Sequence, residues 1–316
     1  MNSFMYALEQ GKLEELRKYP KADLHNHFAL GGNRRFLYQA TGKKIVPVSS
    51  PLSSMEEMHQ WEQKYIGQDF NCTEMRKTLI RATFQQAKED GITVLEIGED
   101  VWGLKEFFNN DVDELVNAFI SAQKEIAPDI ELRLQIGLSR HCSIGYLEDC
   151  LSYFWGNKNF YSIDLYGDEL AQPIENFKGI YRRAKKEGLR LKAHVGEWGT
   201  AKDVRTAVEE LELDEVQHGI AAADDESVIH FLADNKIRLN ITPTSNILLG
   251  RVADMSMHPI KKFYRSGVDV TINSDDILIF DSDVSKEYLR LYESQCLTVE
   301  ELEDIRINGL KPVTNR

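Results

Sequence analysis

The fold is decided by residues 189–218, LRLKAHVGEWGTAKDVRTAVEELELDEVQH. Two short strand-like runs, Leu189–His194 and Glu215–His218, each end in a histidine, and Ala201–Leu211 between them has apolar residues at helical spacing. Parallel strands need a crossover of about a dozen residues or more, usually a helix. The stretch therefore predicts a strand–helix–strand unit with one histidine at the carboxyl end of each strand.

The same alternation runs through the rest of the chain. Further strands are expected at 22–25, 92–97, 132–138, 162–166, 237–241 and 268–273, and further helices at 74–90, 112–126, 173–187 and 225–234. Gly91, Gly188 and Gly267 stand where helices should end. Eight strands alternating with helices predict an α/β fold, a single (β/α)₈ TIM-type barrel over residues 1–316.

Two segments depart from the simple alternation. Residues 42–65 make the first strand-to-helix connection unusually long, so we expect extra helices there and a contribution to a lid over the barrel mouth. Extra helices are also expected after the eighth strand. The polar tail Lys311–Arg316 is expected to be frayed.

Composition narrows the class of protein. The net charge of −13 and the pI near 5.2 give a nucleic-acid backbone little electrostatic help. The four cysteines show no C-x-x-C spacing and read as reduced thiols, and no run resembles a signal peptide or a membrane span. We expect a cytoplasmic enzyme that binds neither nucleic acid nor membrane, with an oligomeric state that the sequence leaves open.

Metal-type and acid or base residues gather at the predicted strand ends. His25 and His27 alternate along the first strand and should point to one face, His194 and His218 end the fifth and sixth strands, and Asp275 follows the eighth. Three histidines and an aspartate so placed can close around one hard-to-borderline cation such as zinc. Asp275 and its neighbour Asp276 would otherwise form a turn or cap. The remaining histidines, 59, 141, 230 and 258, lie in helical or loop context, where a structural role is the simpler interpretation.

The ordered series of motifs resembles the adenosine deaminase family of amidohydrolase barrels, from about Pro20 to the helices after Asp276. The motifs are KADLHNH (21–27), LYGDE (165–169), HVGE (194–197), QHG (217–219), TPTSN (242–246) and INSDD (272–276).

The resemblance implies that His25, His27, His194 and Asp275 ligate one Zn²⁺ per chain. The expected fourth strand, 162–166, has no lysine that could be carboxylated to bridge a second metal. The metal would lower the pKa of its bound water.

The resemblance also implies the catalytic roles. His218 would orient or deprotonate the metal's water, and Glu197 would protonate N1 of a purine as hydroxide adds to C6. Asp276 would hold N7, the Gly167 backbone N–H would meet N3, and Asp275 would act beside the metal. The residues alone indicate a metal hydroxide beside a carboxyl acid; the purine follows only from the family.

One position departs from the family pattern. Ala29 stands where the family usually carries the aspartate that binds the 5′-hydroxyl of a nucleoside. Either another group supplies that contact or the substrate differs. Arg34 and Arg35 could meet an anionic 5′ extension or form a solvated face.

Three interpretations follow from these features. The first is zinc-dependent deamination of adenosine or 2′-deoxyadenosine. The second is deamination of adenine, a 5′-modified adenosine or another amino-heterocycle. The third is a barrel that binds a nucleoside without turnover, which the presence of Glu197 and His218 disfavours.

Overall fold

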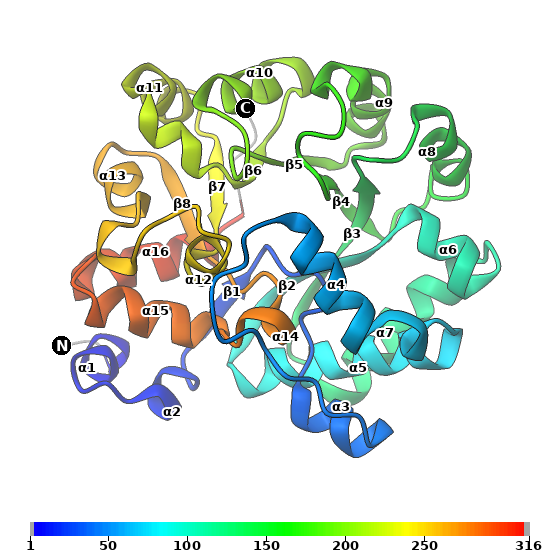
Figure 1. Cartoon of the computed structure of the whole chain (residues 1–316), viewed down its shortest axis with the longest axis horizontal. Helices are drawn as coiled ribbons and strands as arrows, with labels where there is room; N and C mark the ends of the chain where they lie inside the picture. Colours follow the sequence, from blue (N-terminus) through cyan, green and yellow to red (C-terminus); the bar gives the residue numbers. More distant parts are fainter. Residues whose placement is uncertain (1–2, 313–316) are drawn as a thin grey trace.

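The computed structural model describes residues 3–312, and eight parallel strands form its single sheet (Figure 1). Each strand pairs with the next in the chain. The strands are β1 (Lys21–Asp23), β2 (Ile92–Asp100), β3 (Glu131–Ser139), β4 (Phe160–Tyr166), β5 (Arg190–Val195), β6 (Glu215–His218), β7 (Arg238–Ile241) and β8 (Asp269–Ile272). Beyond the strand ends Asn26 bridges to Asp275, and the Asp275 N–H donates to the His25 carbonyl at 2.9 Å. These bonds join the last strand to the first, and the predicted (β/α)₈ barrel is confirmed.

Helices surround the sheet and fill the connections. Those before and within the first connection are α1 (Ser3–Glu9), α2 (Leu13–Leu16), α3 (Arg34–Thr41), α4 (Met55–Tyr65), η1 (Gly67–Phe70) and α5 (Thr73–Glu89). The middle of the chain adds α6 (Val101–Phe108), α7 (Val112–Ile126), α8 (Ile144–Leu151), η2 (Ile174–Phe177), α9 (Lys178–Glu187), α10 (Ala201–Leu211), η3 (Ile220–Asp224) and α11 (Glu226–Asp234). The last are α12 (Pro243–Leu248), η4 (Met255–Met257), α13 (Ile260–Arg265), α14 (Ile277–Phe280), α15 (Val284–Glu293) and α16 (Val299–Gly309).

Local sequence explains where the helices begin and end. Thr200 and Asp203 form a capping box that starts α10, because each side chain accepts a backbone N–H of the other residue. Gly188 has φ +84° and ends α9 in the left-handed conformation that glycine adopts without strain. The helices at 112–126 and 201–211 match their predicted bounds. The one predicted at 173–187 divides into η2 and α9.

Most strand ends lie within one or two residues of the prediction, and the bounds of two strands change which residues reach the barrel mouth. The first ends at Asp23 rather than residue 25, because the Leu24 N–H donates to the Asn273 side chain at 2.8 Å instead of extending the ladder. The placing of both histidines within that strand was therefore wrong, since they follow it. The second continues past residue 97 to Asp100, since Glu99 and Asp100 pair with the third strand. Residues 313–316 of the predicted frayed tail lie outside the described residues.

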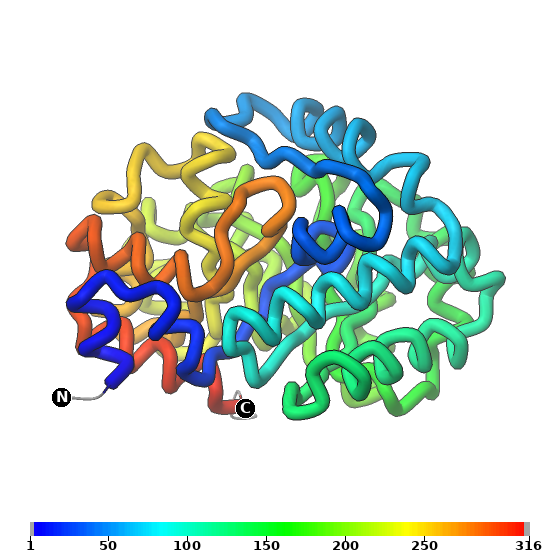
Figure 2. The backbone as a smooth tube through the Cα atoms, turned by 90° about the horizontal axis from the view of Figure 1, so that it is seen from below, coloured from blue at the N-terminus to red at the C-terminus, as the bar shows by residue number. Residues whose placement is uncertain are grey.

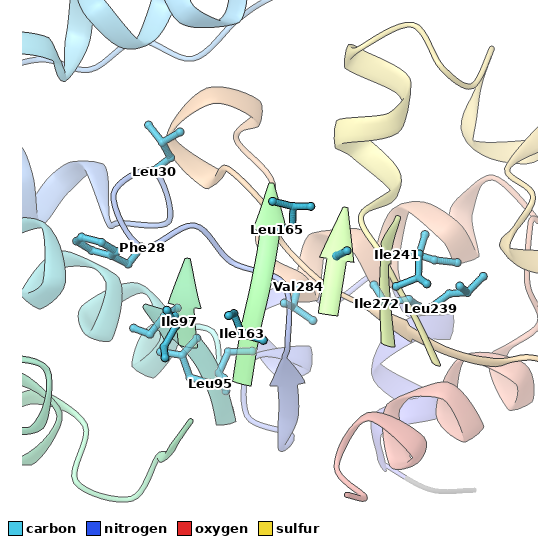
Figure 3. Packing of buried hydrophobic residues seen from close by; sticks show 14 of the residues in the cluster. Phe28, Leu30, Leu95, Ile97, Ile163, Leu165, Leu239, Ile241, Ile272 and Val284 are labelled. Carbon is cyan, nitrogen blue, oxygen red and sulfur yellow. The ribbon is translucent and has the colours of Figure 1, made fainter. Parts of the chain in front are cut away.

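The barrel wall is apolar outside and polar within. Leu95, Ile97, Ile163 and Leu165 belong to the buried cluster between the strands and the helices (Figure 3). Within the barrel, Lys192 is fully buried, and its Nζ lies 2.8 Å from Glu96 and 3.1 Å from Glu215. Lys192 Nζ also donates to the carbonyl of Leu24, at 3.3 Å. This ionic layer therefore contacts the segment that carries the first two histidines.

The long first connection crosses the top of the barrel. Figure 2 shows this segment, in the lighter blues, along the upper edge of the molecule. It is tied down by backbone bonds from Val48 to Ile279 and from Leu52 to Leu248, at 3.0 and 2.6 Å. The expected extra helices are present: α4 lies within this segment, α3 directly precedes it, and further helices follow the last strand. Within residues 3–312 no helix has the length and apolar character needed to cross a membrane.

Candidate active site

Four side chains meet at the carboxyl ends of β1, β5 and β8: His194 is the penultimate residue of β5, and the other three residues follow β1 and β8. The Nε2 atom of His194 lies 3.0 Å from that of His25 and 3.2 Å from that of His27. Oδ1 of Asp275 lies 3.6 Å from His25 Nε2 and 3.3 Å from His27 Nε2. All four belong to buried or half-buried residues. The structure therefore brings together the complete set of predicted metal ligands.

The hydrogen-bond partners of Nδ1 in two of the histidines show which ring nitrogen carries no proton. His25 Nδ1 lies 3.0 Å from the Asn240 carbonyl oxygen, and His194 Nδ1 lies 3.3 Å from Oδ1 of Asp164. Both partners only accept, so each Nδ1 carries the proton and each Nε2 presents a lone pair. Two lone pairs facing one another at 3.0 Å repel unless a cation lies between them. Acceptors of this kind, which bind the ring N–H on the side away from the metal, typically fix the tautomer and the orientation of metal-binding histidines.

The spacing of the four atoms fits a tetrahedral zinc ion. Ligand bonds of about 2.0–2.2 Å in a tetrahedron place neighbouring ligand atoms about 3.3–3.6 Å apart. Four of the separations between these atoms, given above, run from 3.0 to 3.6 Å. The local field also favours positive charge. Burial lowers the pKa of His27, but Asp276 and Asp275 outweigh it and raise that pKa to about 10. Nitrogen and oxygen ligands at these separations suit zinc.

Two carboxyl oxygens beside this cluster are buried and unpaired. Within residues 3–312, Glu197 Oε1 and Asp276 Oδ1 have no hydrogen-bond partner, and both residues line the same cavity. Burial and the charge of Asp275 raise the pKa of each carboxyl group well above its usual value. Both shifts favour the protonated form of the carboxyl group, which can donate to a ligand in the cavity. The Nε2 atom of His218 lies 3.4 Å from Glu197 Oε1.

The loop that carries Glu197 is held by a residue to which sequence analysis gave no role. The carboxylate of Glu169 is buried and accepts four consecutive backbone N–H groups. Oε1 accepts from Gly196 at 2.6 Å, and Oε2 accepts from Glu197, Trp198 and Gly199 at 3.1, 2.8 and 3.1 Å. Gly196 has φ +74°, and a Cβ there would meet Val204 at 2.3 Å, so only glycine fits. Glu169 and this tight turn together fix the position of Glu197.

These residues line a cavity of about 270 Å³ at the barrel mouth. Ala29 and Gly167 line it, as do His27, His194, His218, Asp275 and Asp276, so it contains most of the predicted site residues. His25 lies beneath it in the metal cluster. From the long first connection, α4 contributes Met55, Met58, His59 and Glu62 to the lining. The predicted lid segment therefore covers part of the cavity.

A polar wall that the sequence did not indicate lies on the side of the cavity formed by β2, β3 and α5. Arg76 and Glu99 make a bidentate ion pair with contacts of 2.6–3.0 Å, and the guanidinium lies over the rings of Phe28 and Phe107. Asp100 accepts from the hydroxyl of Ser139 and from the Trp102 backbone, the latter at 3.1 Å. Burial raises the pKa of Asp100 to about 7. The unexpected extension of β2 explains why these carboxyl groups were not anticipated.

The two arginines after the departing motif lie elsewhere. Arg34 donates to Asp281 and to the carbonyls of Ile277 and Leu278, and Arg35 pairs with Glu89 at 2.7 Å. Neither lines the cavity. The expectation that they could meet an anionic 5′ extension is therefore wrong.

The four histidines assigned structural roles are absent from the possible metal clusters of the described chain. His59 and His141 nevertheless line the cavity, which the sequence did not indicate. His258 is buried, and His230 is exposed on α11.

Comparisons with known proteins agree with the fold and with the deaminase motifs. The family model for adenosine deaminase matches residues 20–314. A Treponema pallidum (strain Nichols) protein named as an adenosine/adenine deaminase is 32% identical, covering 90% of this chain and 95% of its own. An adenine deaminase of Vibrio parahaemolyticus is 27% identical, covering 92% and 90%.

A solved amidohydrolase from Burkholderia ambifaria with bound Zn superposes with a TM-score of 0.80 at 19% identity, covering 98% of this chain and 87% of its own. It supports the barrel fold. The metal-ligand cluster, the barrel and a family match over almost the whole length lead to one conclusion: this chain belongs to the adenosine deaminase family, hydrolases that act on C–N bonds.

Proposed function

We propose that this protein hydrolytically deaminates an unphosphorylated 6-aminopurine, in the first place adenosine or 2′-deoxyadenosine, at a site for one zinc ion. The observation that carries the proposal is the pair of buried, unpaired carboxyl oxygens of Glu197 and Asp276 beside the four-ligand cluster. Leaving a buried polar atom without a partner costs about 1–3 kcal/mol. Two such atoms in one cavity indicate a ligand that supplies two acceptors, as N1 and N7 of a purine do.

The metal ligands in this proposal are His25, His27, His194 and Asp275. When bound, zinc would lower the pKa of a water molecule and so supply a nucleophile near neutral pH. The rest of the chemistry belongs to side chains of the chain.

Glu197 donates its proton to N1 of the purine, which makes C6 electrophilic. Asp276 donates to N7, and the backbone N–H of Gly167 donates to N3, so that C6 faces the metal cluster. His218 stabilises the negative charge that develops as oxygen adds to C6. Of the two protons of the water, one returns to Glu197 and one passes to the exocyclic amine. The C6–N bond then breaks, and ammonia leaves. The product is a 6-oxopurine.

The charges of the cavity favour a substrate without phosphate. Among the described residues, Arg76 is the one arginine or lysine that lines the cavity, and Glu99 already neutralises its guanidinium with two short contacts. Glu62 and Asp100 add carboxyl groups to the same lining. A phosphate dianion would therefore have to break an ion pair or lie against carboxylates, and both cost free energy. We infer that adenosine monophosphate is a poor substrate.

Free adenine is the second candidate. Ala29 lines the cavity without offering a hydrogen bond to a 5′-hydroxyl, so the sugar loses a contact typical of the family. The Vibrio relative is named for adenine, and the Treponema relative for both substrates. The absence of that contact favours weak discrimination between nucleosides with and without the hydroxyl.

The experiment is an ammonia-release screen of the zinc-loaded protein with adenosine, 2′-deoxyadenosine, 5′-deoxyadenosine, adenine and adenosine monophosphate. We expect adenosine and 5′-deoxyadenosine to differ in kcat/KM by about tenfold or less, because Ala29 has no polar group to leave unpaired. Adenosine monophosphate should rank last. A marked preference for the phosphate ester would contradict the charge argument. A preference of about a hundredfold for adenosine over 5′-deoxyadenosine would show that another group binds the 5′-hydroxyl.

A further inference from the structure

Both ring nitrogens of His218 have polar neighbours. Its Nδ1 atom, on the side away from Glu197, lies 3.0 Å from the Thr242 hydroxyl and 3.2 Å from the Asn246 Nδ2 atom. A neutral imidazole carries one proton, so these contacts decide whether the nitrogen facing Glu197 is a donor or a bare base. The Thr242 hydroxyl can donate or accept. It also lies 3.4 Å from Asp275 Oδ2, but this contact is longer than a normal O–H···O bond and does not commit its one hydrogen, so Thr242 does not decide the question. The amide of Asn246 can decide it, provided that its orientation is fixed.

The orientation of that amide is set from the far side by His258. This ring is buried, and burial lowers its pKa to about 3, so it is neutral. The backbone N–H of Ile260 donates to His258 Nδ1 at 3.1 Å. A backbone N–H is a donor only, so Nδ1 is the bare nitrogen and the proton of His258 lies on Nε2. That atom lies 3.2 Å from Asn246 Oδ1 and donates to it.

The remaining assignment follows along the chain of bonds. Because Asn246 accepts at Oδ1 from His258, its NH₂ group faces His218 Nδ1 and can only donate. His218 Nδ1 is therefore the acceptor, and the ring proton lies on Nε2, the nitrogen on the Glu197 side of the ring, 3.4 Å from Glu197 Oε1 and too far for a hydrogen bond. One backbone N–H, at Ile260, thus determines the tautomer of a histidine in the active site.

We propose that Asn246 and His258 form a positioning relay that holds His218 as the Nε2–H tautomer. The proposal rests on the proposed function, in which His218 faces the reacting centre. In this state His218 offers an N–H to the developing oxygen charge and does not take a proton from water at Nε2. The water proton that does not go to the amine therefore goes to Glu197, once Glu197 has given its own proton to N1. The relay also explains why His218 is not a fifth metal ligand. A ring nitrogen of His218 lies within 4.8 Å of those of His25 and His194, but a protonated Nε2 cannot bind a metal.

The direct test is long-range ¹H–¹⁵N NMR of zinc-loaded protein labelled with ¹⁵N-histidine, with His218→Gln identifying the resonances of His218. In the unchanged protein we expect a pyridine-like Nδ1 and a pyrrole-like Nε2 for His218. Asn246→Asp keeps the shape but cannot donate, so it should transfer the proton to Nδ1. It should also lower kcat by about tenfold or more with KM changed much less, since the substrate contacts remain. Asn176→Asp, an exposed residue far along the chain, is the control for the charge change and should leave both readouts unchanged.

A second pair of variants separates the relay from simple packing. His258→Gln retains a donor for Asn246 and an acceptor for Ile260, and should keep the tautomer and most of the activity. His258→Leu retains neither and should give a mixed His218 tautomer with reduced kcat. A pyrrole-like Nδ1 in the unchanged protein, or equal behaviour of the two His258 variants, would overturn the relay. Failure of the proposed function would look different: no substrate of the screen would release ammonia, while the NMR assignment would still follow the variants.

Discussion

Replacing Glu169 with glutamine tests how the general acid is held in place. Glu169 Oε2 accepts three backbone N–H groups and Oε1 accepts a fourth, from Gly196. An amide has only one oxygen. If it faces the three donors, its NH₂ group meets the Gly196 N–H, which loses its acceptor. That unpaired donor costs about 1–3 kcal/mol, and the three remaining bonds lose their charge assistance.

The expected consequence is a displaced Glu197 in a folded protein. Because about 1.4 kcal/mol corresponds to a factor of ten in rate, Glu169→Gln should lower kcat by about ten- to a hundredfold. Zinc content should be unchanged, since the metal ligands lie outside residues 196–199. Asp168→Asn is the matched control, because it makes the same chemical change one residue away at an exposed side chain. The assays are steady-state kinetics on the best substrate of the screen, metal analysis and thermal unfolding.

Equal kinetics in Glu169→Gln and Asp168→Asn would refute this reasoning. Loss of zinc together with loss of activity would show instead that Glu169 supports the metal cluster rather than the loop.

Three further predictions concern the barrel interior and the polar wall. Lys192→Met should lower the free energy of unfolding by about 3–5 kcal/mol, because it leaves two buried carboxylates without their cation. The assay is urea titration, and the control is Lys185→Met at an exposed side chain, which should lower the same free energy by about 1 kcal/mol or less. Burial raises the pKa of Asp100 to about 7, so between about pH 4 and about pH 7 the folded state binds more protons at this group than the unfolded state does. The free energy of unfolding therefore falls as pH rises through this range. Asp100→Asn removes this pH dependence. The free energy of unfolding of the variant, relative to that of the unchanged protein, should therefore increase between about pH 5 and about pH 7.5. A difference that stays constant with pH would contradict the raised pKa of Asp100. Ala29→Asp should shift kcat/KM toward adenosine over 5′-deoxyadenosine, and no shift would place residue 29 away from the sugar.

Sequence patterns predicted the ligand cluster because its members follow strand ends, and parallel strands of a barrel bring those ends together whatever their separation in the chain. The histidines and Asp275 needed no knowledge of loop conformation. The same argument located the long first connection, because its length alone exceeds what a simple crossover requires.

The supporting residues could not be predicted in this way. Glu169 holds a loop about thirty residues further along the chain through hydrogen bonds to backbone N–H groups. Every residue type except proline has such a group, so the sequence of the loop does not show which side chain binds it. The pair of Arg76 and Glu99 depends on β2 continuing through two charged residues, where patterning ends a strand. His258 looked structural because its effect on the site passes through Asn246. Such contacts are set by three-dimensional packing of side chains with no common spacing.

The central claim is hydrolysis at C6 of a 6-aminopurine by the cluster of His25, His27, His194 and Asp275 with Glu197. The most direct measurement is mass spectrometry of the products formed by the zinc-loaded protein from adenosine, or from adenine if that is preferred, in water enriched in ¹⁸O. The proposed mechanism predicts a 6-oxopurine that contains one ¹⁸O atom for each ammonia released. A product without ¹⁸O, cleavage of the bond between sugar and base, or the absence of any product from every member of the screen would contradict it.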